Sequence, residues 1–80
     1  MNNEEIRNII RGKIKDLTFV NATDDQSLLK AKLLDSIIVV DLAVELEQEF
    51  GFKIPFTEIT EDNFETISSI AAYIQSRITA

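Results

Sequence analysis

The segment from residue 36 to residue 50 constrains the fold most strongly, because its apolar residues recur at helical spacing almost without interruption. Gly51 follows directly, and glycine suits the left-handed conformation found just past a helix C-terminus. Asp35 and Ser36 stand at the other end, and both residue types favour the N-cap of a helix. We therefore expect a helix at about residues 36–50.

Two further segments show the same helical spacing of apolar residues. They predict helices at about residues 3–16 and 66–79, the second capped by Thr66. A short helical turn is expected at about residues 57–62, after the extended segment around Pro55. Strand-like alternation is scarce, and the chain has only two glycines and one proline. The sequence predicts an all-α bundle of three main helices and one short helix.

Residues 17–34 are polar with scattered apolar positions and predict a long structured loop between the first two helices. At about 18 residues it exceeds the usual length of a connection, so its apolar residues should pack on the core. With 80 residues and 45% apolar content, residues 1–80 should form a single domain.

The composition excludes many kinds of active site. The chain has no cysteine and no histidine, which removes thiolate nucleophiles, disulfides, imidazole catalysis and Cys/His zinc sites. Asp24 and Asp25 are adjacent, but the spacing of a calcium-binding loop is absent. These absences exclude most enzyme mechanisms, and we expect no metal site.

The net charge of −6 repels nucleic acid and anionic membranes. No apolar run approaches the roughly 20 residues of a membrane span, and the N-terminus is acidic where a signal peptide is basic. We expect a cytoplasmic protein with no nucleic-acid partner and no membrane insertion. The acidity is concentrated in residues 33–66, where nine acids face only Lys53. This region either serves solubility or attracts basic partners.

A helical wheel separates two apolar stripes on the helix expected at 36–50. The core-facing stripe comprises Val39, Leu42, Ala43, Leu46 and Phe50. Ile37, Val40 and Val44 form a second stripe, turned roughly 120° from the first. Acidic and amide side chains border it: Asp41, Glu45, Glu47 and Gln48. The second stripe is either a protein-docking surface or part of a wide buried face.

Ser36 stands at the first turn of this helix, where the macrodipole and free backbone amides favour an attached anion. It could equally act only as an N-cap. It is a poor hydrolase nucleophile, because the chain has no histidine and the sequence around it is not Gly-x-Ser-x-Gly. A modified serine is more plausible than a catalytic one.

Several short motifs share one register: Leu34-Asp35-Ser36-Ile37, Val40-Asp41-Leu42, Leu46-Glu47, Glu49-Phe50-Gly51 and Ile54-Pro55. Together they resemble the acyl carrier and peptidyl carrier protein family. The resemblance covers the whole chain in length and helix order. It implies an acyl-carrier-like four-helix bundle.

The resemblance also implies a prosthetic group. Ser36 would carry 4′-phosphopantetheine, attached by a separate Mg²⁺-dependent phosphopantetheinyl transferase with coenzyme A as donor. The terminal thiol would hold an acyl or aminoacyl group as a thioester, and the chain itself would catalyse nothing. Asp35 would cap the helix and help to position the transferase. Ile54 and Ile59 resemble positions beside the prosthetic arm, although they could equally be core.

The partner-recognition residues implied by the resemblance are Ile37, Val40, Asp41, Val44 and Glu47. The implied partners are the transferase, a loading ligase, and a downstream acyltransferase or synthase, with the carrier itself a monomer. The pathway could be fatty-acid, polyketide, nonribosomal peptide or D-alanyl transfer. Ile38 and the Leu33-Leu34 pair depart from fatty-acid-synthesis carriers and look closer to stand-alone carriers of amino acids, such as D-alanyl carrier proteins, or carriers in specialised pathways.

An alternative of another class remains open. The chain could be an unmodified acidic helical adaptor that binds a partner groove through Ile37, Val40 and Val44.

Overall fold

The first helix, α1 (Asn3–Thr18), begins at a capping box in the computed structural model, which describes residues 1–78. The Asn2 side chain accepts a hydrogen bond from the Glu5 amide at 2.8 Å, and the Glu5 carboxylate accepts one from the Asn2 amide at 3.3 Å. The helix ends at Phe19, which adopts the left-handed conformation and donates its amide to the Lys15 carbonyl. The helix thus runs two residues beyond the expected range of 3–16.

The second helix, α2 (Ile38–Phe50), ends at Gly51 as the sequence indicated. Gly51 has φ +74°, and its amide donates to the Glu47 carbonyl at 2.9 Å. The helix begins two residues later than the expected start at residue 36, because Ser36 and Ile37 form a turn that leads into it.

The single short helix expected at 57–62 divides into two in the structure. A 3₁₀ turn, η1 (Phe56–Glu58), precedes the short helix α3 (Glu61–Phe64). Thr60 separates them because its backbone is extended and its hydroxyl accepts a hydrogen bond from the Asn63 amide, which starts a new helix.

The last helix, α4 (Ile67–Ile78), follows Thr66, whose hydroxyl accepts the Ser69 amide at 2.9 Å. The cap expected at Thr66 is therefore present. Residue 79, the expected end of this helix, lies outside the described residues.

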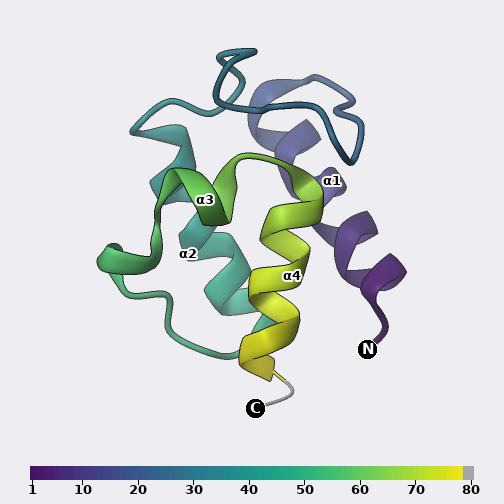
Figure 1. Ribbon diagram of the computed structural model, residues 1–80, viewed down its shortest axis with the longest axis vertical. Coiled ribbons are helices and arrows are strands. Elements are labelled where there is room, and N and C mark those ends of the chain that lie inside the picture. The colour runs from purple at the N-terminus through teal and green to yellow at the C-terminus, as the bar shows by residue number, and fades with distance from the viewer. Residues whose placement is uncertain (79–80) are drawn as a thin grey trace.

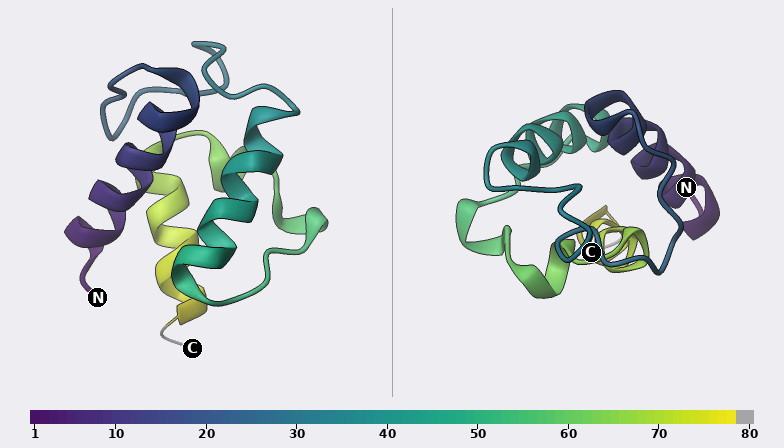
Figure 2. Two further views of the ribbon diagram at one scale, coloured as in Figure 1. Left: turned by 180° about the vertical axis from the view of Figure 1, so that it is seen from behind. Right: turned by 90° about the horizontal axis from the view of Figure 1, so that it is seen from above.

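The three long helices lie side by side, with α1 antiparallel to α2 and α4 (Figures 1 and 2). Residues 19–37, here called the loop, cross over one end of the bundle, and the N-terminus lies at the other end. Residues 1–78 contain four α-helices and no strand. The prediction of an all-α, acyl-carrier-like bundle is confirmed.

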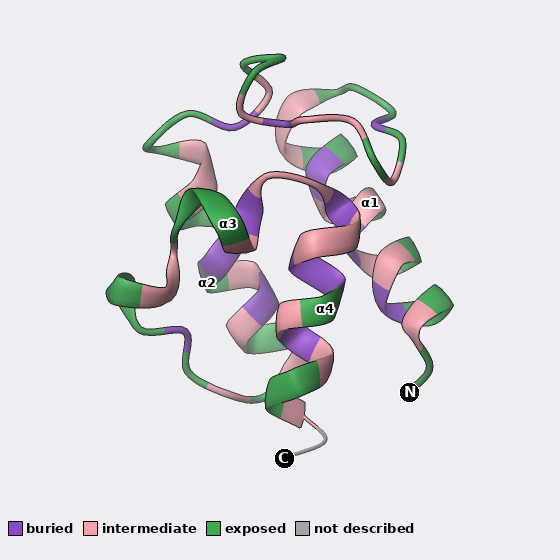
Figure 3. Ribbon diagram, viewed as in Figure 1, coloured by how far each residue is buried: buried purple, intermediate pink, exposed green. Residues whose placement is uncertain are grey.

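The core lies between the helices and receives side chains from all four of them and from the loops (Figure 3). Its buried members are Ile6, Ile10, Ile14, Ala22, Leu28, Leu34, Leu42, Ala43, Leu46, Ile54, Phe64, Ile67, Ile70, Ala71 and Ile74. None of them is polar or charged. Burial of these side chains is the main driving force for folding.

The loop is fastened to the core by apolar burial and by backbone hydrogen bonds. Leu28 and Leu34 are buried, as expected for a loop of this length. The Leu28 amide donates to the Glu65 carbonyl at 2.7 Å, and the Ser68 amide donates to the Asp24 carbonyl at 3.0 Å. The loop is therefore tied to the segment where α4 begins.

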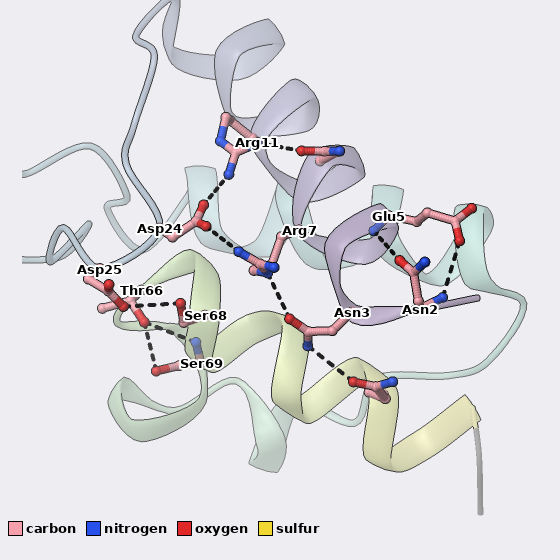
Figure 4. A network of polar contacts seen from close by, with 12 residues as sticks. Asn2, Asn3, Glu5, Arg7, Arg11, Asp24, Asp25, Thr66, Ser68 and Ser69 are labelled. Atoms are coloured by element: carbon pink, nitrogen blue, oxygen red, sulfur yellow. Dashed lines mark hydrogen bonds and ion pairs between the residues drawn. The ribbon is translucent and has the colours of Figure 1, made fainter.

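Asp24 adds a charged clamp between the loop and α1 (Figure 4). Its carboxylate pairs with Arg7 at 2.5 Å and also with Arg11. Hydrogen bonds from Arg11 and Arg7 hold the pKa of Asp24 below its ordinary value. Arg7 also donates to Asn3, and Asn3 donates to Gln75 of α4 at 3.1 Å. One polar network thus joins the loop, α1 and α4.

Candidate functional site

Asp35 caps the turn that leads into α2. Its Oδ1 atom accepts the backbone amides of Ile37 at 2.9 Å and Ile38 at 2.8 Å, and its carbonyl accepts the Val39 amide at 2.9 Å. Two amides that the sequence left free for an anion are therefore occupied by this carboxylate. Asp35, and not Ser36, is therefore the residue whose side chain caps the start of α2.

Ser36 is exposed and lies in the last turn of the loop, two residues before α2. Within residues 1–78, no hydrogen bond or ion pair involves its side chain. Its hydroxyl is consequently free of a structural role, which is the condition that attachment of a group at this atom requires.

Ile37, Val40 and Val44, here called the strip, are exposed on the side of α2 that faces away from the core. Their exposed fractions are 72%, 37% and 45%. Leu42 and Leu46 on the core-facing stripe are fully buried. The strip is therefore not part of a wide buried face, and an apolar row of this kind needs another explanation.

The acids beside the strip differ in how far they are already engaged. Asp41 is exposed and forms no ion pair with any described residue. Glu45 and Glu49 pair with Lys13 of α1 at 3.8 Å and 3.4 Å. The free negative charge along α2 is thus concentrated near Asp41 more than the sequence indicated.

Glu47 is tied to the segment after α2. Its Oε2 atom accepts the Ile54 amide at 2.6 Å. Ile54 itself is buried and Ile59 packs against the core, so the structure places both of these residues in the packing of the bundle. Glu47 therefore positions the chain between α2 and η1 in addition to carrying charge.

A groove of about 370 Å³ lies at the C-terminal end of α2. Its lining residues are Val44, Glu47, Gln48, Gly51, Phe52 and Lys53. Sequence reasoning missed this groove, because helical spacing predicts which residues share a face but not how the chain folds back after Gly51. The available indication was that Val44, Gln48 and Gly51 continue the strip at spacing i, i+4 and i+7.

Phe52, in the wall of the groove, is held by residues of α4. Its ring lies 6.2 Å from the ring of Tyr73, and the Arg77 guanidinium lies 5.6 Å above it. Glu58 accepts a hydrogen bond from the Tyr73 hydroxyl and pairs with Arg77 at 2.6 Å. Burial and the hydrogen bond to Glu58 raise the pKa of Tyr73 to about 12, so the phenol stays neutral at ordinary pH.

The described residues hold no cluster of three or more acids that could bind a metal ion. No helix among them is both long and apolar enough to cross a membrane.

Comparisons with known proteins agree with this geometry. The family described as "Phosphopantetheine attachment site" matches residues 4–74. The chain is 31% identical over 80 residues to aminoacyl carrier protein 1 of Bradyrhizobium diazoefficiens, which covers 95% of this chain and 89% of that protein. It is 37% identical over 51 residues to the D-alanyl carrier protein of Streptococcus pyogenes serotype M1, which covers 64% of this chain and 65% of that protein. The family match begins one residue inside α1, includes α2 and α3 in full, and ends within α4. The chain belongs to the phosphopantetheine-attachment family and is a carrier protein whose prosthetic group is 4′-phosphopantetheine.

Proposed function

We propose that Ser36 is the attachment site and that the protein carries an aminoacyl group as a thioester. The observation that carries the proposal is that Asp35 and Ser36 have different roles at the start of α2. Asp35 makes both capping hydrogen bonds, which leaves the Ser36 hydroxyl exposed and without a partner among the described residues. The hydroxyl can then be modified without loss of the helix cap.

Attachment needs only a hydroxyl from this chain. Ser36 Oγ would form a phosphoester bond with the pantetheinyl phosphate of coenzyme A, losing its proton as adenosine 3′,5′-bisphosphate leaves. A separate transferase with Mg²⁺ would supply the base and the charge stabilisation. Asp35 is committed to the cap through its Oδ1 atom, which accepts two backbone amides. The chain is accordingly a substrate and not an enzyme.

The attached group supplies a terminal thiol, which a chain without cysteine lacks. Two similar proteins carry names that specify amino acids as cargo, one aminoacyl and one D-alanyl. The Leu33-Leu34 form before Asp35 favours the same class. A ligase that activates an amino acid would load the thiol, and an acyltransferase or synthase would receive the aminoacyl group.

The strip and Asp41 form the docking surface for these partners in this proposal. The strip begins beside Ser36 and continues along α2, so an enzyme that reaches the serine also covers the strip. Apolar contact would provide affinity, and Asp41 would attract a basic rim on the partner.

The test is the intact mass of the protein after incubation with coenzyme A, Mg²⁺ and a broad-specificity phosphopantetheinyl transferase. We expect a gain of one phosphopantetheinyl unit in the parent and in Ser76→Ala, a control on the exposed face of α4. Ser36→Ala should gain nothing while its circular dichroism and melting curve match those of the parent.

An unmodified parent with native melting behaviour would overturn the proposal and favour the adaptor alternative. Modification of Ser36→Ala would also overturn it, because the group would then sit on another residue.

A further inference from the structure

The exposed row that starts beside Ser36 leads directly into the groove. Ile37, Val40 and Val44 lie on one side of α2, and Val44 is also the first residue of the groove lining. Gln48 and Gly51 continue the same side of the helix into the groove. In Figure 1, α2 runs from the end of the bundle that the loop crosses toward the opposite end.

The length of this path matches that of the arm proposed for Ser36. With a rise of about 1.5 Å per residue, Val44 lies roughly 12 Å and Gln48 roughly 18 Å from Ser36 along the helix. The arm has about 14 bonds from the serine oxygen to the sulfur, and an extended chain advances roughly 1.2 Å per bond, which gives roughly 17 Å. An extended arm along the strip therefore ends inside the groove.

The groove offers groups that fit an amino acid held as a thioester. Glu47 uses Oε2 for the Ile54 amide, and its Oε1 atom makes no hydrogen bond with any described residue. Lys53 is exposed and has no ion pair within residues 1–78. Val44 and Phe52 supply apolar walls, and Phe52 is fixed by Tyr73 and Arg77.

An aminoacyl thioester presents a cationic ammonium group next to a carbonyl oxygen. We propose that the groove at the C-terminal end of α2 is a docking site for the carried aminoacyl group, with Glu47 Oε1 binding its ammonium. Lys53 donates to a carbonyl oxygen of the arm, and the small side chain of the cargo faces Val44 and Phe52. This inference rests on attachment at Ser36. It further implies that a partner enzyme displaces the arm when it covers the strip.

The test compares two cargoes that differ in one amino group. The apo protein would be loaded by the transferase with amide-linked pantetheine analogues that end in alanyl or in propionyl, which resist hydrolysis. We expect amide chemical shifts of Gln48, Phe52 and Lys53 in ¹⁵N nuclear magnetic resonance spectra to move much further from their unloaded positions in the alanyl form than in the propionyl form, because only the alanyl group has the ammonium that Glu47 binds.

Glu47→Gln is the matched variant, because its amide oxygen can still accept the Ile54 amide while the charge is lost. The alanyl shifts should disappear in this variant, whereas the unloaded spectrum should keep the native dispersion. Alanyl and propionyl spectra that agree at these three amides, or shifts that persist in Glu47→Gln, would overturn the docking site. Failure of the transferase to modify Ser36 at all is a different result, since it overturns the attachment proposal itself.

Discussion

The loop, which contains Ser36, and the helix α2 that follows it differ strongly in how their side chains are engaged. The loop is held by burial of Leu28 and Leu34, by backbone bonds to Glu65 and Ser68, and by the clamp at Asp24. The outer face of α2 presents the strip to solvent, and Asp41 beside it has no ion pair among the described residues.

This difference indicates that the loop is held rigidly against the core, whereas the outer face of α2 is available for contacts with other molecules. A long connection costs conformational entropy unless it is fastened. Here the fastening fixes the backbone that leads into Asp35 and Ser36. The strip contributes little to the fold, so its apolar residues are explained better by contacts outside the chain.

The largest expected effect comes from a pair of substitutions that remove the same number of carbon atoms. Leu28→Ala empties a fully buried site in the loop and should lower the free energy of unfolding by about 3 kcal/mol. Ile37→Ala truncates a side chain that is mostly exposed and should change it by less than about 0.5 kcal/mol. Urea unfolding of both variants checks the difference.

The two variants should rank in the opposite order when the rate of modification by the transferase is measured. Ile37→Ala should slow modification by the transferase several-fold, because a docking contact is lost, whereas Leu28→Ala should react normally at temperatures where it is folded. Equal destabilisation by the two variants would contradict the contrast between the loop and the strip.

Asp24→Asn tests the charged clamp and should cost about 1 kcal/mol near neutral pH, since partly exposed ion pairs are screened by solvent. The folded-state pKa of Asp24 is lower than its ordinary 3.8. Its contribution to stability is therefore fully present above the unfolded pKa and is lost as pH falls through the folded pKa. Parent and variant should therefore converge in stability as the pH falls below the ordinary value of 3.8 and through the lowered folded-state pKa.

Asp25→Asn is the control for this prediction, because within residues 1–78 the Asp25 side chain accepts a single hydrogen bond, from the Ser68 hydroxyl at 3.1 Å. It should lose less stability than Asp24→Asn at neutral pH. The prediction would be contradicted if the difference in free energy of unfolding between the parent and Asp24→Asn stayed constant down to the lowest pH. The stability lost in the variant would then not come from the charge of the carboxylate.

A third prediction concerns Tyr73, which supports the wall of the groove and should also make a modest contribution to stability. It is the one tyrosine of the chain, so tyrosinate absorbance reports on it alone. The folded protein should titrate near 12, against an ordinary value of 10.0. Because the folded pKa is raised, this contribution to stability is complete below the unfolded pKa and is lost as pH rises through the folded one.

Tyr73→Phe removes the hydrogen bond to Glu58 and should cost about 1 kcal/mol at neutral pH. A tyrosinate midpoint near that of the unfolded chain would contradict the buried, hydrogen-bonded phenol.

The helices could be predicted from the sequence because apolar spacing and end residues act locally. Gly51 and Thr66 mark helix ends in the structure as they do in the sequence. The start of α2 was placed two residues early, because the sequence could not decide which of Asp35 and Ser36 makes the cap. The break at Thr60 was missed because an isolated threonine is compatible with a continuous helix as well as with a new cap.

The site could be predicted only in part for the same physical reason. The wheel grouped Ile37, Val40 and Val44, but exposure depends on which helices pack nearby and so required the structure. The clamp at Asp24 joins residues more than ten positions apart, and no local pattern indicates such a contact. The groove depends on the path of the chain after Gly51, which tertiary contacts of Phe52 determine.

The smallest expected effect on stability, and the sharpest on recognition, belongs to Asp41→Lys. Asp41 is exposed and unpaired among the described residues, so reversal of its charge should alter the free energy of unfolding by less than about 0.5 kcal/mol. The loading rate should nevertheless fall and become less dependent on salt, because steering of a basic partner toward the strip is weakened. Modification kinetics over a range of ionic strengths measure this. Glu49→Lys is the control, since Glu49 already pairs with Lys13. If both reversals slow loading equally, negative charge acts diffusely over α2, and the strip has no charged residue that directs its partners.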